Sequence, residues 1–149
     1  MVTATDILVT AGVRDQVDRH AMAWFPRECC GLLVTGPKGH GAVLADNGLD
    51  EAVQAHSGHT RSAGQQGYLL DPREILRSER RGERLVAIFH SHCHVGAYFS
   101  DEDRRQALSP SNTPWFPDVE YVVLDAHPDG VKGYKVFQWS EAAEDFVQR

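Results

Sequence analysis

The sequence has little of several features that would assign it to a special class of protein. Its 149 residues include only 3 cysteines. Two of them, Cys29 and Cys30, are adjacent and hard to bridge, so we expect no disulfide framework and a reducing compartment. No apolar run approaches the roughly 20 residues of a membrane-spanning helix, and no basic stretch precedes an apolar one at the N-terminus. These absences predict a cytoplasmic protein without a membrane partner.

Basic charge is scarce as well. Lysine and arginine together number 15, against 21 aspartates and glutamates, which gives a net charge of -6. A nucleic-acid-binding surface would show a basic patch, so we expect no nucleic-acid partner. The sequence contains no internal repeat, charge block or low-complexity segment. A chain of this length buries enough surface for one core, and a single domain over residues 1–149 is predicted.

The pattern of apolar residues predicts an α/β protein with a mixed β-sheet packed by helices. Apolar runs bounded by turn residues predict strands at 7–10, 29–35, 41–45, 68–70, 85–89, 121–124 and 131–139. Helices are predicted between Gly12 and Pro26, from Asp71-Pro72 to about Arg81, and from Ser100 onward. Residues 54–67, rich in Gly, Ser, His and Gln, and residues 109–117, with three prolines, are predicted to be surface loops.

The chemistry concentrates where the predicted strand 85–89 ends in His90-Ser91-His92. Residues i and i+2 of an extended chain point the same way, so both imidazoles are expected on one side, close enough to share a metal ion. A bare His-x-His carries little weight, because roughly 0.4 such patterns are expected by chance in a chain with this many histidines. One packed and one exposed histidine would be the ordinary interpretation.

Two further polar residues follow at defined spacings. Ser100 comes after seven intervening residues and Asp103 after two more, which lowers the chance expectation to roughly 0.002. Ser-x-x-Asp before a helix also resembles a capping box, in which the two side chains accept hydrogen bonds from free backbone N–H groups. The two interpretations are compatible for Ser100 but compete for the carboxylate of Asp103.

Together these residues resemble the signature of the JAMM (MPN+) zinc metalloprotease family. That family also needs an upstream glutamate, often within Pro-x-Glu-x-Cys-Gly, and residues 26–31 match this pattern at each fixed position with Glu28 as the glutamate. Residues 68–74 resemble the family's segment between the glutamate and the histidines. The resemblance spans residues 7–139 and implies an MPN/JAMM (cytidine-deaminase-like) architecture of the small, stand-alone prokaryotic type.

The resemblance also implies a role for each matched residue. His90, His92 and Asp103 would hold Zn²⁺ and leave a fourth position for water, which is the open arrangement of catalytic zinc. Glu28 would take a proton from that water, and Ser100 would donate a hydrogen bond to the oxyanion of the reaction intermediate. Because Glu28 immediately precedes a predicted buried strand, where an idle charge would be costly, a functional role is favoured over a solvated one.

The chain departs from the family pattern after the second histidine, where proline is common and Cys93-His94 stands here. His92 and His94 form a rival pair, but that register places Glu102 where the pattern has serine. His94 is therefore interpreted as a residue of the cleft or its rim. For Cys93 two interpretations stay open, a thiol near the metal and a buried residue, and Cys30 is expected in the core.

Members of the family cleave isopeptide bonds to ubiquitin-like proteins or trim the C-terminal tail of sulfur-carrier proteins of ubiquitin-like fold. The short chain resembles the small stand-alone members, which implies a zinc-dependent peptidase or isopeptidase acting on the tail of such a carrier. The alternatives are a metal-free scaffold of the same fold, deubiquitinase-like removal of protein conjugates and a thiol hydrolase using Cys93. A scaffold predicts decay of the ligand set, and all five positions are intact. A deaminase-like zinc enzyme would need Pro-Cys-x-x-Cys, which the sequence lacks.

Overall fold

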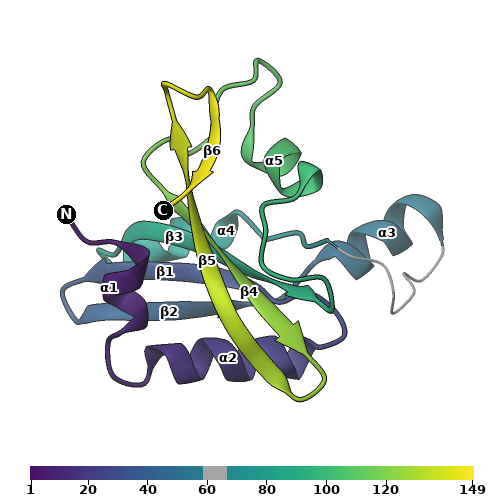
Figure 1. Ribbon diagram of the computed structural model, residues 1–149, viewed down its shortest axis with the longest axis horizontal. Coiled ribbons are helices and arrows are strands. Elements are labelled where there is room, and N and C mark those ends of the chain that lie inside the picture. Colours follow the sequence, from purple (N-terminus) through teal and green to yellow (C-terminus); the bar gives the residue numbers. More distant parts are fainter. Residues whose placement is uncertain (59–66) are drawn as a thin grey trace.

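The computed structural model describes residues 1–58 and 67–149. Within these residues a six-stranded mixed sheet forms the centre, in the order β2-β1-β3-β4-β5-β6 (Figure 1). The strands are β1 (Cys30–Gly36), β2 (Gly39–Ala45), β3 (Arg84–Cys93), β4 (Glu120–His127), β5 (Gly130–Ser140) and β6 (Asp145–Gln148). β3 and β4 are parallel and the other neighbouring pairs are antiparallel, so the prediction of a mixed sheet is confirmed.

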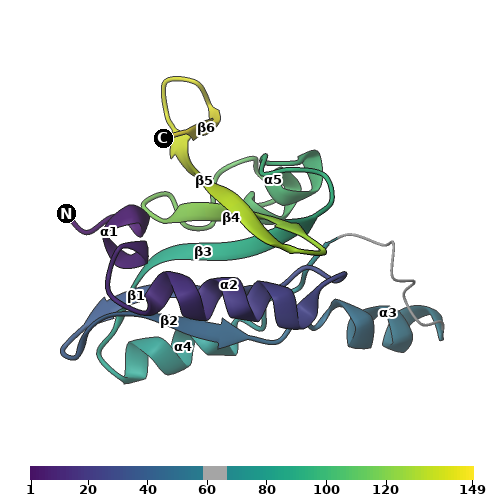
Figure 2. The same cartoon turned by 60° about the horizontal axis from the view of Figure 1, so that its bottom comes forward.

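Helices cover both faces of this sheet. The described residues form α1 (Ala4–Leu8), α2 (Val13–Trp24), α3 (Leu49–Ser57), α4 (Arg73–Arg80) and α5 (Asp101–Ala107). One core cluster joins α1 and α2 to one face, along which Figure 2 shows α2 lying, and a second joins α4 and α5 to the other. α3 projects away from the sheet in both views, and none of its 9 residues is buried. None of the helices that the structure describes is long and apolar enough to cross a membrane.

β3 lies inside the sheet, hydrogen-bonded to β1 on one edge and to β4 on the other. Its residues from position 86 to Cys93 are all buried, which explains why the sequence here reads as a continuous apolar run. The strand continues past the predicted end at residue 89, so His90 and His92 stand within the sheet. Side chains alternate along a strand, so the two histidines share the face of α5 while Phe89 points to the face of α2.

The prediction of a strand at residues 7–10 is wrong, because this part of the chain begins as helix α1. Thr3 and Asp6 form a capping box at its N-terminus, and the side chains of Ala4, Ile7 and Leu8 are buried on one face. That spacing of three and four is helical, whereas Val9, which a buried strand would have covered, is 74% exposed. The local capping box and the tertiary contacts of the helix outweigh the strand propensity of the β-branched residues.

Two other predicted segments differ from the structure. Of the predicted loop 54–67, residues 54–57 belong to α3 and residues 59–66 lie outside the described part of the chain. Residues 68–70 are not a strand and pair with no strand of the described residues; their backbone hydrogen bonds go to side chains and to Gly48. β6, a short strand that pairs with the end of β5, was not predicted from the sequence. The predicted helices after Gly12, after Pro72 and at Ser100 are confirmed as α2, α4 and α5.

Candidate metal centre

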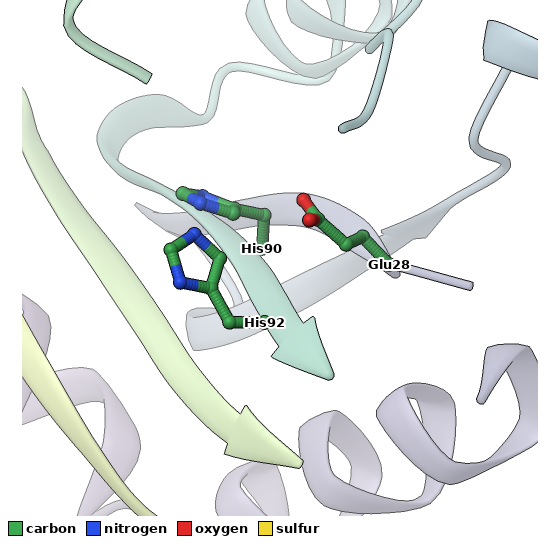
Figure 3. A group of neighbouring side chains, drawn as sticks. All are labelled: Glu28, His90 and His92. Carbon is green, nitrogen blue, oxygen red and sulfur yellow. The ribbon is translucent and has the colours of Figure 1, made fainter. Parts of the chain in front are cut away.

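β3 places His90 and His92 next to each other on the sheet face that α5 covers (Figure 3). The two residues are 0% and 3% exposed, and their ring centroids are 5.1 Å apart. Asp103 of α5 reaches both rings: its Oδ1 lies 3.1 Å from Nε2 of His90 and its Oδ2 lies 3.1 Å from Nε2 of His92. One buried carboxylate therefore contacts both imidazoles.

Asp103 also takes part in the N-terminal cap of α5. Ser100 Oγ accepts the backbone N–H of Asp103 at 3.0 Å, and Oδ2 of Asp103 accepts the backbone N–H of Ser100 at 3.0 Å. The sequence predicted competition for this carboxylate, but the structure satisfies both uses, since Oδ2 serves the cap while it faces His92, and Oδ1 faces His90. Burial acts to raise the pKa of Asp103, yet the contacts with His90 and His92 hold that pKa well below its ordinary value. The carboxylate is therefore charged and fixed in orientation.

Glu28 precedes β1 and points toward His90 in Figure 3. One of its carboxylate oxygens, a nitrogen of His90 and a nitrogen of His92 all lie within 4.8 Å of one another. The residue is 3% exposed, and burial raises the pKa of its carboxyl group above the ordinary value. Among the described residues its Oε1 has no hydrogen-bond partner. A buried carboxyl group with a raised pKa and an available oxygen has the properties of a general base.

The hydrogen bonds of the two imidazoles suit a metal ion. Nδ1 of His92 lies 3.0 Å from the carbonyl oxygen of Gly96, so this nitrogen carries a proton. When the ring is neutral, Nε2 is therefore unprotonated, and its lone pair faces Asp103. Nε2 of His92 and Oδ2 of Asp103 are then two acceptors facing each other, unless the ring is protonated or a cation lies between them. Within the described part of the chain neither ring nitrogen of the fully buried His90 makes a hydrogen bond of good geometry, although its Nε2 lies 3.1 Å from Oδ1 of Asp103.

The separations and the donor types also fit a metal such as zinc. Two ligands on a tetrahedral zinc ion, each about 2.0–2.1 Å from it, lie roughly 3.3 Å from each other. The nitrogen–oxygen separations of 3.1 Å at Asp103 are close to that value. Two imidazoles with one carboxylate form a common zinc donor set. His90, His92 and Asp103 can therefore hold the ion with Glu28 beside it, or Glu28 can act as the carboxylate ligand.

A cavity of about 190 Å³ opens beside these groups and is lined by Glu28, His92, Ser100 and Asp103 among others. His90, the fifth predicted residue, is fully buried and contacts Asp103. The structure thus brings the five predicted residues together from the segment before β1, from β3 and from the N-terminus of α5. The oxygen of the Ser100 hydroxyl accepts the cap hydrogen bond, which leaves the hydroxyl proton available to donate into the cavity.

Tyr68 and Gly31, which were not assigned to the site from the sequence, both lie against residues of β3. The ring of Tyr68 stacks on His90 with centroids 4.5 Å apart and an interplanar angle of 20°. Gly31, the last residue of the Pro-x-Glu-x-Cys-Gly match, lies under the ring of Phe89, where an added Cβ would come within 2.4 Å of the ring. The signal for Tyr68 was its place in the family-like segment 68–74, but nothing local indicates that it contacts His90.

Neither His94 nor Cys93, the residues left open after the motif, is among the described residues that line the cavity. His94 is exposed, has a φ of 73°, and its ring packs 5.0 Å from that of Phe25. Cys93 is 1% exposed, and its Sγ donates to the carbonyl oxygen of Arg27 at 3.4 Å. Cys93 is thus buried, which agrees with one of its two interpretations, and Cys30 lies in the core as predicted.

Comparisons with known proteins agree with this fold. The family described as prokaryotic homologs of the JAB domain matches residues 10–139. No curated protein matches the sequence significantly. The solution structure of protein DSY2949 from Desulfitobacterium hafniense is similar, with a TM-score of 0.62 and 22% identity over 94% of this chain and 87% of that one. The solution structure of a protein from Salinibacter ruber has a TM-score of 0.59 and 22% identity over 100% and 88%. At this identity the two likenesses show the shared fold.

Proposed function

Because this chain belongs to the family of prokaryotic homologues of the JAB domain, we propose that it is a zinc-dependent peptidase or isopeptidase acting on the C-terminal tail of a ubiquitin-like, sulfur-carrier-type protein. The observation that carries the proposal is the buried group of Glu28, His90 and His92, with Asp103 in contact with both imidazoles. A domain that served only as a scaffold would have no use for these groups, and burying idle charges is costly. The intact donor set therefore supports an enzyme.

The residues divide into two sets by role. His90, His92 and Asp103 would hold the ion, because their donor atoms converge and Asp103 is already charged and fixed by the cap. Zinc in such a site lowers the pKa of a water molecule in its open position toward about 7 and polarises a carbonyl group. Gly96 fixes the tautomer of His92 and so keeps its Nε2 available.

Glu28 and Ser100 would handle the proton and the developing charge. Glu28 accepts a proton on Oε1, which has no hydrogen-bond partner among the described residues, and then passes it to the leaving nitrogen. Its raised pKa brings the carboxyl group closer to the operating pH. Ser100 donates a hydrogen bond from its hydroxyl group to the carbonyl oxygen of the substrate as that oxygen becomes negative. Both side chains line the same cavity, so one substrate bond can meet both.

The proposed substrate class is a flexible tail, ending in a Gly-Gly-type sequence. The resemblance of the motif and the short chain support this class, and the cavity is compatible with it because it is small. Val95 and Tyr98, which line the cavity, are 54% and 48% exposed and offer apolar surface to an extended chain. A small cavity beside buried groups favours small residues at the bond to be cleaved.

The test is a cleavage assay on a panel of ubiquitin-like carriers with C-terminal extensions, or with an isopeptide-linked lysine peptide. Protein stripped by a chelator is compared with protein reloaded with one equivalent of zinc, and products are identified by mass spectrometry. We expect release only from the zinc-loaded protein, and none from carriers without an extension. Zinc-bound protein that releases nothing from any carrier would overturn the peptidase proposal and favour a metal-binding scaffold.

A further inference from the structure

Asn47 is a buried amide that uses all four of its hydrogen-bonding positions. Its Nδ2 donates to the carbonyl oxygens of Glu28, at 2.9 Å, and of Gly67, at 3.1 Å. Its Oδ1 accepts the backbone N–H groups of Leu49 and Leu69, each at 3.0 Å. The residue is 4% exposed, so these bonds are made away from solvent, where losing one of them is costly.

The segments that Asn47 joins carry one side of the metal centre. Glu28 is the residue proposed as the base. Gly67 lines the cavity and donates its backbone N–H to the Glu28 carboxylate. Tyr68, between the two positions that Asn47 binds, stacks on His90. Asn47 therefore links the main chain of Glu28 to residues 67–69, and Gly67 binds the Glu28 carboxylate. The side chain of Asn47 also holds the residues on either side of Tyr68, whose ring stacks on His90.

Backbone structure alone does not hold this segment. Residues 67–70 pair with no strand among the described residues, although their chain runs next to the sheet. The φ of Gly67 is +119°, a conformation that side-chain-bearing residues rarely adopt, and it lets the residue bond Glu28 with its N–H and Asn47 with its carbonyl group. The remaining described bonds are from Gly48 N–H to the Leu69 carbonyl at 2.9 Å and from the Gln106 side chain to the Tyr68 carbonyl at 3.1 Å. The side chain of Asn47 thus takes the place of a neighbouring strand.

We propose that Asn47 is a positioning residue of the metal centre: it holds Glu28 and the stacking ring of Tyr68 in place from one point. It touches neither the ligand atoms nor the cavity. Its effect on turnover rests on the proposed function, but its effect on the geometry of the site does not. Asn47 also binds the backbone N–H of Leu49, the first residue of the projecting helix α3.

The informative variant is Asn47→Asp, which has the same shape and keeps the acceptor but replaces both donors by an oxygen that faces two carbonyl groups. Asn47→Ser is a second variant, in case the first does not fold. Ser78→Ala is the matched control, because Ser78 is a buried polar residue of α4 that bonds Arg81. Each protein is compared at equal folded fraction, checked by circular dichroism.

The first measurement is the NMR shift of the His90 ring protons in metal-free protein. Stacking by Tyr68 shifts these protons upfield, so we expect a downfield move in Asn47→Asp and Asn47→Ser and none in Ser78→Ala. In the wild type we expect the amide protons of Leu69 and Leu49 to exchange slowly, although the Leu69 residue is 45% exposed. Unchanged His90 shifts in the Asn47 variants, or fast exchange of both amides in the wild type, would overturn the proposal.

The second measurement is steady-state cleavage by the zinc-loaded proteins. Loss of a supporting partner around a metal site typically costs about 10- to 100-fold in activity, and we expect that loss in kcat with KM unchanged. A rise in KM at constant kcat would show that Asn47 acts on substrate binding and would contradict a role through Glu28. If the wild type cleaves no carrier, the proposed function fails, and the NMR measurements still decide the role of Asn47.

Discussion

On one side of the candidate metal centre, His90 and His92 stand on a strand bonded along both edges, and Asp103 stands on a capped helix. On the other side, Glu28 and Gly67 stand on segments outside the strands, joined by the side chain of Asn47. The first side, which we call the ligand side, is built by regular secondary structure. The second, the base side, is built by long-range hydrogen bonds to one amide.

This difference matches the two tasks proposed for the site. Metal ligands must be held at fixed separations, and a central strand with a capped helix supplies rigid positions for them. A base must hold and release a proton, and its carboxylate must stay near the ligands without being locked by strong partners. Glu28 satisfies this because one of its oxygens has no partner among the described residues. Substitutions of the donor residues on the ligand side should therefore lower zinc affinity, whereas substitutions on the base side should lower turnover at unchanged zinc affinity.

The largest effect is expected from His90→Ala, which removes a donor from the ligand side. Loss of an outer partner costs about 10- to 100-fold in metal affinity, and loss of a ligand should cost more than 100-fold and abolish turnover. Zinc at 100 times its wild-type Kd stabilises the wild type by about 2.7 kcal/mol, and this stabilisation should be absent from the variant. Chelator competition and thermal unfolding measure both.

The matched control for that variant is His94→Ala, because His94 is exposed and packs against Phe25. It should bind zinc as the wild type does. If His94→Ala lost zinc while His90→Ala kept it, the rival pair of His92 and His94 would be the correct one.

A smaller effect is expected from Ser100→Gly, which tests whether a residue of the ligand side also does chemistry. Glycine costs only a few tenths of a kcal/mol as an N-cap, whereas alanine costs about 1 kcal/mol, so α5 and Asp103 should stay in place. Loss of an oxyanion donor should lower kcat by about 10²- to 10³-fold at unchanged zinc affinity. Ser100→Thr keeps the hydroxyl group and should retain most activity. Full activity in Ser100→Gly would show that Ser100 is a cap and nothing more.

The smallest effect is expected from Gly31→Ala, which adds a methyl group against Phe89 of β3, the strand that carries His90 and His92. The new Cβ would lie 2.4 Å from the Phe89 ring and 2.3 Å from the Val43 carbonyl oxygen, so one of them must move. Overpacking of this kind typically costs about 1–3 kcal/mol in the free energy of unfolding, measurable by urea titration. Gly41→Ala on β2 is the control, since nothing lies within 4 Å of its added Cβ. Equal stability of the two variants would contradict this account of the Pro-x-Glu-x-Cys-Gly glycine.

The two sides also differ in how far the sequence predicted them. On the ligand side, the alternation of a strand and the Ser-x-x-Asp cap are local patterns, and they indicate which side chains share a face. The alternation predicted that His90 and His92 share a face, whereas the place of Asp103 beside them came from the resemblance to the JAMM family. What neither showed is that the Asp103 carboxylate serves the cap and both imidazoles at once, because this depends on where α5 packs.

The base side could not be read from local patterns. Glu28 was found through its motif, but Asn47 bonds residues 19 to 22 positions away, and no periodicity marks such a residue. Tyr68 was assigned to a strand because its neighbours are apolar, although the segment is held by side chains. The same limit explains the error at α1, where the capping box and burial decided the structure, and the missed β6, whose only strand partner in the described chain is the end of β5.

The most direct test of the division into two sides is the zinc affinity and the turnover of Glu28→Gln measured on one preparation. This variant keeps the shape of the side chain but removes the base, so we predict one zinc ion per chain at wild-type affinity and a loss of turnover of about 10²- to 10⁴-fold. Loss of zinc binding would show that Glu28 is a ligand, and turnover at the wild-type rate would contradict its role as the base.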